Sequence, residues 1–170
     1  MRKPKLIFVI MCVVIATLVF MTGCTDEYIA TLDEPEITVE YLTGEYARQL
    51  IRDGAKVLLG TIDLRKVSED EIIVIIREKD IVSDPDFIHA FYIADRNLES
   101  EYMLSQGVRA TFHMRDENIV VPMERDEFKD AVWIDFFEAM IADPNGQDYR
   151  LYDIYIIGYY VELLIARVLP

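Results

Sequence analysis

An uninterrupted apolar run near the N-terminus constrains this chain most, because it separates residues that can join a folded domain from residues that cannot. The run extends from Leu6 to Phe20 and follows the basic residues Arg2, Lys3 and Lys5. A permanent transmembrane helix needs about 20 apolar residues, and this run is shorter. A positive start before a short apolar stretch is typical of a secretory signal. We therefore expect residues 1–23 to be a signal peptide that the mature protein lacks.

The next residues, Met21-Thr22-Gly23-Cys24, resemble the lipobox of bacterial lipoproteins. Thr22 and Gly23 match the small residues of that pattern, whereas Met21 stands where Leu is preferred. The resemblance implies cleavage after Gly23 and lipidation of Cys24, which would anchor the mature chain to the extracytoplasmic face of a bacterial membrane. One acyl chain alone gives only marginal membrane binding, whereas two acyl chains give a stable anchor. The alternatives are an uncleaved membrane anchor and an ordinary signal peptide followed by an unrelated cysteine.

Cysteine content requires the mature chain to fold on its hydrophobic core alone. The chain has two cysteines, and Cys12 lies in the apolar run and would leave with the signal. An acylated Cys24 then forms no disulfide and offers no thiol for catalysis or metal binding. Large side chains are nevertheless abundant, with ten Tyr, eight Phe and one Trp. These residues predict a folded core rather than disorder.

The charge of the chain excludes some partners. Its net charge is −14, and removal of Arg2, Lys3 and Lys5 with the signal lowers the charge to −17. Binding to nucleic acid needs a cationic surface that displaces counterions. Docking on anionic lipid headgroups through a basic patch needs the same. We therefore expect no nucleic acid partner, and we expect membrane attachment through the lipid on Cys24.

Composition divides the mature chain into a short tether and one domain. Residues 24–35 are acidic and end at Pro35, and they form the predicted lipidated tether. Residues 36–170 have the length of one ordinary domain. No Gly/Ser-rich spacer follows the lipobox, so the domain is expected close to the membrane.

Hydrophobic periodicity predicts the elements of that domain. A short helix is expected after Thr43, with Gly54 ending it. Residues 57–64 and 72–82 read as a hairpin, and residues 87–94, 108–114 and 119–121 read as further strands. Residues 124–142 predict a long amphipathic helix. Its expected apolar stripe is Phe128, Val132, Phe136 and Met140, widened by Trp133, Phe137 and Ile141.

The C-terminal residues 149–169 predict a closing hairpin that turns near Gly158. Together these elements predict an α+β domain, with an antiparallel bent sheet or small β-barrel, one long amphipathic helix and a short N-terminal helix. The order of elements is similar to that of small OB-type barrels. Segments such as Tyr92-Ile93-Ala94-Asp95-Arg96-Asn97 resemble segments of uncharacterised exported proteins of Gram-positive bacteria, and that resemblance implies no function.

Catalytic patterns are missing from the sequence. There is no G-x-S-x-G nucleophile elbow and no glycine-rich phosphate loop. His89 and His113 lack metal-ligand spacing, so we interpret them as ordinary strand residues rather than as ligands that share a metal with an acidic partner. Asp95-Arg96-Asn97 could line a site at a strand end, but a turn with a local ion pair is favoured. We therefore predict no catalytic residue and no cofactor.

A weak calcium-loop pattern lies after the long helix. Asp143, Asn145 and Asp148 supply oxygens at spacings similar to those of calcium loops. The glycine of the EF-hand pattern stands fourth instead of sixth, and Ile154 takes the place of its final Glu. A helix-ending turn is naturally rich in Asp, Asn, Pro and Gly. A turn is the favoured interpretation, and calcium binding is the alternative.

Tyrosines in the C-terminal hairpin suggest a surface for a partner. Side chains alternate along a strand, so Tyr152, Ile154 and Ile156 are expected to point inward. Tyr149 and Tyr155 would then point outward, where Tyr is common at binding hot spots. The competing interpretation is that both faces of the hairpin are covered.

Three functions remain as hypotheses. The first is a membrane-anchored, non-catalytic domain that binds an envelope protein or a cell-surface component. The second is a small-ligand or calcium-sensing domain. The third is an envelope hydrolase that uses a pair of carboxylates, which the sequence cannot select among 31 acidic residues.

Overall fold

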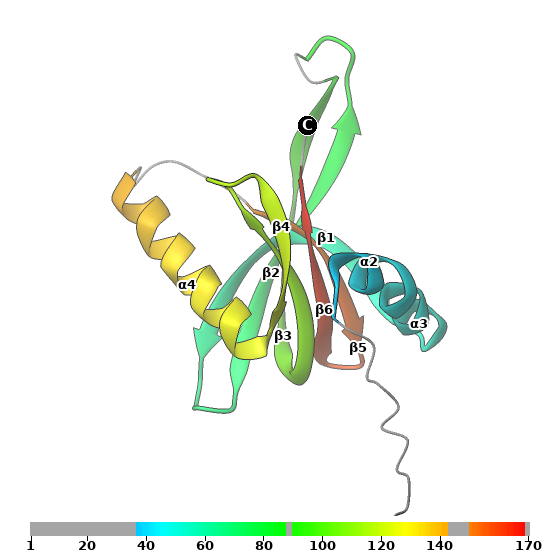
Figure 1. Ribbon diagram of the computed structural model, residues 1–170. Coiled ribbons are helices and arrows are strands. Elements are labelled where there is room, and N and C mark those ends of the chain that lie inside the picture. The colour runs from blue at the N-terminus through cyan, green and yellow to red at the C-terminus, as the bar shows by residue number, and fades with distance from the viewer. Residues whose placement is uncertain (1–36, 88–89, 143–149, 169–170) are drawn as a thin grey trace, which may run out of the picture. The chain divides into compact units, whose positions relative to one another are not determined.

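Six strands form one sheet in a computed structural model that describes residues 37–87, 90–142 and 150–168 (Figure 1). All of these residues belong to one unit, Glu36–Pro170. The strands are β1 (Lys56–Lys66), β2 (Ile72–Ser83), β3 (Phe91–Met114), β4 (Ile119–Glu124), β5 (Leu151–Ile157) and β6 (Tyr160–Arg167).

The strand pairings close a ring. The order is β2-β1-β5-β6-β3-β4, and an additional pairing of β2 with β3 joins five strands, β1, β2, β3, β6 and β5, into a barrel. Every pairing is antiparallel except that of β3 with β6, which is parallel. With β4 set aside as an addition to β3, this connectivity is that of an OB-type barrel.

Alternating burial explains why these segments are strands. In β2, Ile72, Val74 and Ile76 are fully buried, whereas Ile73 and Ile75 between them are partly exposed. This period of two places one set of side chains inside the barrel and the other outside. The barrel core is formed by residues Leu58, Ile72, Val74, Ile76, Leu104, Val108, Ala110, Phe112, Phe128, Tyr152, Ile154, Ile156, Val161 and Leu164.

Strand β3 differs from the prediction. Residues 95–107, a polar stretch between the predicted strands 87–94 and 108–114, are part of one strand of 24 residues. Asp95 and Glu99 there pair with charged residues of β2, and Glu101 pairs with Arg65 of β1, so polarity marks the outer face of the strand rather than a loop. Asn97 (φ 53°) takes the left-handed conformation at a register shift against β2 and bends the strand there.

Helix α4 (Arg125–Ala142) lies within the predicted helical segment. Near its N-terminus it contributes Phe128, which is fully buried between Phe112 and Tyr152 with ring centroids 6.3 and 5.8 Å away. The predicted stripe does not hold along the whole helix, because Phe136 is 53% exposed. Only the N-terminal half of the described stripe packs into the barrel.

The N-terminal helical segment consists of α2 (Val39–Tyr41), the π-helical turn η1 (Leu42–Tyr46) and α3 (Ala47–Arg52). It begins earlier than predicted, because Thr38 rather than Thr43 is the cap and accepts a hydrogen bond from the Tyr41 backbone N–H. Gly54 (φ 90°) ends it as expected. The segment packs outside the barrel in a second cluster of Leu42, Ala47, Leu50, Tyr155, Leu163 and Ile165.

The predicted fold class is wrong. The chain is mostly β, and its sheet is mixed rather than antiparallel, because β3 and β6 run parallel. The α+β prediction treated the two helical segments as a main part of the fold, and it treated the middle of β3 as a connection between strands. The helices cover parts of a closed sheet and do not form a separate layer.

Candidate binding surface

The outer sides of β1, β2 and β3 form a continuous surface, which we call the β1–β2–β3 face. The register places Asp63, Ile75 and Glu101 in one row across the three strands. The neighbouring rows hold Thr61, Arg77 and Glu99 on one side, and Arg65, Ile73 and Met103 on the other. The five charged side chains of the face remain between 36% and 57% exposed, so solvent reaches this surface.

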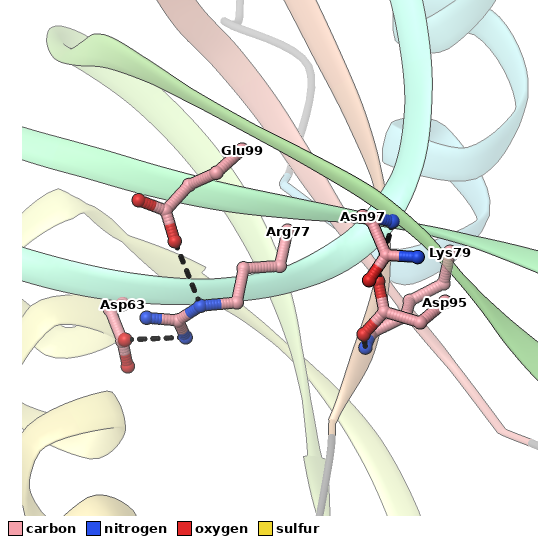
Figure 2. A network of polar contacts seen from close by, with 6 residues as sticks. All are labelled: Asp63, Arg77, Lys79, Asp95, Asn97 and Glu99. Atoms are coloured by element: carbon pink, nitrogen blue, oxygen red, sulfur yellow. Dashed lines mark hydrogen bonds and ion pairs between the residues drawn. The ribbon is translucent and has the colours of Figure 1, made fainter.

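Ion pairs fix the charged groups of the face. Arg77 lies between two carboxylates, with its Nη1 2.7 Å from Asp63 Oδ2 and its Nε 3.0 Å from Glu99 Oε2 (Figure 2). The hydrogen bond to Asp63 is the main reason why the pKa of Arg77 is raised above its ordinary value. Arg65 Nη2 lies 2.8 Å from Glu101 Oε2. Exposed pairs of this kind contribute about 0–1 kcal/mol each, so their main effect here is to hold donors and acceptors in place.

An apolar strip lies among the ion pairs, and the Arg65–Glu101 pair crosses it from β1 to β3 over β2. Ile73, Ile75 and Met103 are partly exposed and sit among the charged side chains. Apolar groups framed by ordered charges are common at specific interfaces, which have an apolar centre and a polar rim. This strip is therefore the best candidate for the centre of a binding surface.

Tyr160, the first residue of β6, borders the face, and Tyr159 precedes it in the β5–β6 turn. Tyr160 pairs with Met103 in the parallel register and is 51% exposed. The backbone carbonyl of Tyr159 accepts a hydrogen bond from the Met103 N–H at 3.0 Å, and the Tyr159 ring lies 5.9 Å from that of Tyr102. Tyr159 itself is 56% exposed. Tyr160 thus lies beside Met103 at the edge of the strip, whereas the Tyr159 ring lies against Tyr102, whose side chain packs on the barrel core.

A second polar group marks the end of the face, where β2 continues past β1. Lys79 Nζ lies 2.5 Å from Asp95 Oδ2, and the Asn97 backbone N–H donates to Asp95 Oδ1 at 2.8 Å (Figure 2). These contacts lower the pKa of Asp95, with the bond from Lys79 as the largest cause. Asp95, Arg96 and Asn97 thus form a bulge inside β3, and Asp95 and Arg96 pair with charged residues of β2, so the predicted turn with a local ion pair is wrong.

Another charged cluster ties α4 to the barrel. Arg150 pairs with Asp135 through two hydrogen bonds, donates to the His113 carbonyl and lies over the Phe112 ring at 4.2 Å. The nearby Tyr152 hydroxyl is buried without a hydrogen-bond partner among the described residues, and burial raises the pKa of Tyr152. Because Arg150 is fully engaged with the fold, we assign this cluster a structural role.

The tyrosine prediction needs correction at Tyr155. Tyr152, Ile154 and Ile156 point inward as expected and are almost completely buried. Tyr155 lies on the opposite side of β5, but it is only 9% exposed because the N-terminal helices cover that side. It therefore offers no outward ring. Tyr160 belongs to the same tyrosine-rich hairpin and lies two residues after Gly158, but it was not among the residues predicted to point outward.

Several predicted site residues lie outside the described ranges. These are Cys24, His89, Asp143, Asn145, Asp148 and Tyr149. His113 is described, and its Nε2 lies 3.1 Å from Asn118 Oδ1. Within residues 37–87, 90–142 and 150–168, no group of three or more His, Cys, Asp or Glu side chains could hold a metal ion.

Among the helices of the described residues, none is both long enough and apolar enough to cross a membrane. Comparison of the chain with protein-family models, with curated proteins and with solved structures found no match.

Proposed function

We propose that this chain is a bacterial lipoprotein, anchored through Cys24 at the extracytoplasmic face of a membrane, whose barrel is a non-catalytic binding domain. Its partner is another envelope protein or a cell-surface component, and the contact surface is the β1–β2–β3 face with Tyr160 at its border. The signal-like residues 1–23 and the lipobox resemblance support the anchor.

The composition of the face is the observation that carries the binding proposal. Ile73, Ile75 and Met103 form an apolar strip that solvent reaches, and Arg65 and Arg77 are fixed beside it by carboxylates. Exposed Tyr160 adds a large amphipathic ring at the edge. Tyr and Arg are the residue types most enriched at binding hot spots.

Topology supports the same location. OB-type barrels bind ligands on their second and third strands and on the loops that join strands one to two and four to five. The corresponding elements here are β2, β3, the β1–β2 turn and the β5–β6 turn. This argument rests on fold analogy and concerns the place alone, because one fold hosts many functions. The net charge of −14 counts against oligonucleotides as ligands.

Chemical cross-linking in intact cells tests the binding proposal. Tagged full-length protein is captured, and cross-linked partners are identified by mass spectrometry. We expect one dominant partner, whose recovery falls about tenfold in the Tyr160→Ala variant, as for a hot-spot tyrosine. Ile134→Ala is the matched control, because Ile134 is 58% exposed on α4 and lies outside the face. Equal recovery from both variants would remove Tyr160 and the face from the proposal.

The anchor is tested separately. A Cys24→Ser variant is expected to lose incorporation of a clickable palmitate analogue and to move from the detergent phase to the aqueous phase in Triton X-114 partition. The palmitate label should remain in the Tyr160→Ala variant. Wild-type protein that incorporates no palmitate analogue would refute lipidation. The binding proposal would not be affected, because cross-linking tests it separately.

A further inference from the structure

Beyond the barrel, β2 and β3 continue as a two-stranded extension, which we call the arm and define as Lys79–Ser83 and Phe91–Asp95. Pairing of β1 with β2 ends at Gly60 and Glu78, and pairing of β6 with β3 begins at Met103. The arm strands pair with each other from Lys79 and Asp95 to Ser83 and Phe91. Figure 1 shows this ribbon extending past the ends of the other strands. Within the described chain, no third strand pairs with the arm along Asp80–Val82 or along Tyr92–Ala94.

The base of the arm is fixed by polar contacts. Lys79 bonds Asp95 at 2.5 Å, and Arg96 Nη1 lies 3.2 Å from Glu78 Oε2 (Figure 2 shows the first pair). At the same point β3 carries the bulge at Asn97. Bulges beside functional regions typically set the direction of a strand. The arm is therefore held in one direction at its base.

The arm exposes apolar side chains on both faces. Ile81 pairs with Ile93, and Val82 pairs with Tyr92 on the opposite face. Ile81 and Tyr92 are 39% and 37% exposed, and Phe87 beyond the strand end is 53% exposed, with its ring 5.1 Å from that of Tyr92. An isolated two-stranded ribbon is marginally stable. An exposed apolar ribbon whose edges present backbone N–H and C=O groups is therefore a template for an additional strand.

The charge of the arm indicates which kind of segment would pair with it as a third strand. Proteins commonly protect open edges with lysines. Among the described arm residues Lys79 is the one lysine. It is only 5% exposed, and its Nζ forms an ion pair with Asp95. The charged side chains that reach solvent beyond the base are acidic, with Asp86 exposed and Asp84 partly so, and Asp80 is exposed while it lies 3.4 Å from Arg96 Nε. A second copy of the chain would bring the same acids against them, so self-association is disfavoured and a basic segment is favoured.

We propose that the arm is a docking site for an extended, basic segment of another protein, which adds to it as a third strand. Backbone hydrogen bonds would supply affinity, as in other cases of strand addition. A segment added beside β2 would pack the side chains of one face on Ile81 and pair those of the other face with Asp80, with Asp86 beyond the end of the strand. This inference goes beyond the proposed function, because it concerns a different surface.

A designed peptide tests the arm in the full chain, purified in detergent. The probe is a fluorescent peptide of alternating Lys and Val, and its binding is measured by fluorescence anisotropy. We expect the double variant Ile81→Ser/Tyr92→Ser to weaken binding about tenfold or more. Val57→Ser is the matched control, because Val57 is 43% exposed on β1 and lies outside the arm. Tyr160→Ala should leave peptide binding unchanged, which separates this test from that of the β1–β2–β3 face.

Two further measurements test the charge and the strand addition. Asp80→Asn/Asp86→Asn should weaken binding and reduce its salt dependence, whereas Asp130→Asn on α4 should change neither. Hydrogen exchange should slow at backbone amides of Lys79–Ser83 or Phe91–Asp95 when the peptide binds. No binding at millimolar peptide, equal binding of an alternating Glu and Val peptide, or equal binding of a backbone N-methylated probe would overturn the proposal. Arm-dependent dimerisation in sedimentation, or arm-dependent binding to anionic vesicles without peptide binding, would also overturn it in favour of those occupants.

Discussion

Lys79 and Asp95 form an ion pair in which the two partners differ sharply in exposure. Their N–O distance is 2.5 Å, yet the Lys79 side chain is 5% exposed and that of Asp95 is 52% exposed. The pair lies where β2 continues past β1, at the base of the arm. Since a buried ammonium group needs compensation, Asp95 links the stability of this junction to pH.

We expect Asp95→Asn to lower the melting temperature at neutral pH. The pKa of Asp95 is below its ordinary value because Lys79 and then the Asn97 backbone donate to the carboxylate. A depressed native pKa stabilises the fold above the unfolded-state pKa, and that stabilisation is lost as pH falls through the native value. The gap between wild type and variant should therefore close in acid. Asp126→Asn is the control, because its partner Lys129 is 21% exposed, and its effect should be smaller. Equal melting temperatures for wild type and Asp95→Asn at neutral pH would contradict this role.

Gly60→Ala should destabilise the barrel. A Cβ at Gly60 would lie 2.5 Å from the backbone oxygen of Arg77, so β1 and β2 would have to separate. Overpacking of this kind costs about 1–3 kcal/mol, and urea unfolding measures it. Gly107→Ala is the control, because nothing lies within 4 Å of its added Cβ. Similar losses from both variants would show that the close approach at Gly60 is not the cause.

Phe128→Ala and Phe136→Ala compare two phenylalanines of one helix. Phe128 is fully buried against Phe112 and Tyr152, so its loss should cost about 3–5 kcal/mol in the free energy of unfolding. Phe136 is 53% exposed, and its truncation should cost about 1 kcal/mol or less. Chemical denaturation of the two variants measures the difference. A similar cost at both positions would place the helix stripe where the sequence predicted it.

Tyr152→Phe should stabilise the protein. The Tyr152 side chain is 1% exposed, and its hydroxyl has no hydrogen-bond partner among the described residues. An unsatisfied buried polar group costs about 1–3 kcal/mol, so its removal should raise the free energy of unfolding by about 1 kcal/mol. Thermal melting at neutral pH provides the measurement. A lower melting temperature would reveal a hydrogen bond to the hydroxyl in solution.

Local patterns predicted the hairpins well. The β1–β2 hairpin follows from two apolar segments around a polar turn, and both strands fall within a few residues of their predicted ends. The β5–β6 hairpin follows from Gly158, which has a φ of 60° in the turn. In each case the two strands are neighbours in sequence, so the information that pairs them is local.

Pairings between distant segments could not be predicted in this way. The parallel pairing of Met103 with Tyr160 closes the barrel, and nothing local to either residue encodes it. The middle of β3 is polar because its outer side faces solvent and charged residues of β2, and the same composition is typical of a loop. Tyr155 was assigned to the correct side of its strand. Its burial depends on Leu42, Ala47 and Leu50, which lie far away in sequence.

Closure of the ring by its last two strands has a consequence for the order of folding. β3 pairs with β2, which precedes it directly in the sequence. The other edge of β3 pairs with β6, and the free edge of β1 pairs with β5, so both pairings need the last two strands. Contacts of high sequence separation slow folding, because the intervening chain must be ordered first. A chain ending before Leu151 should therefore lack the near-ultraviolet circular dichroism of the native protein. In a polypeptide that leaves a ribosome or crosses a membrane with its N-terminus first, the ring thus stays open until β5 and β6 have emerged.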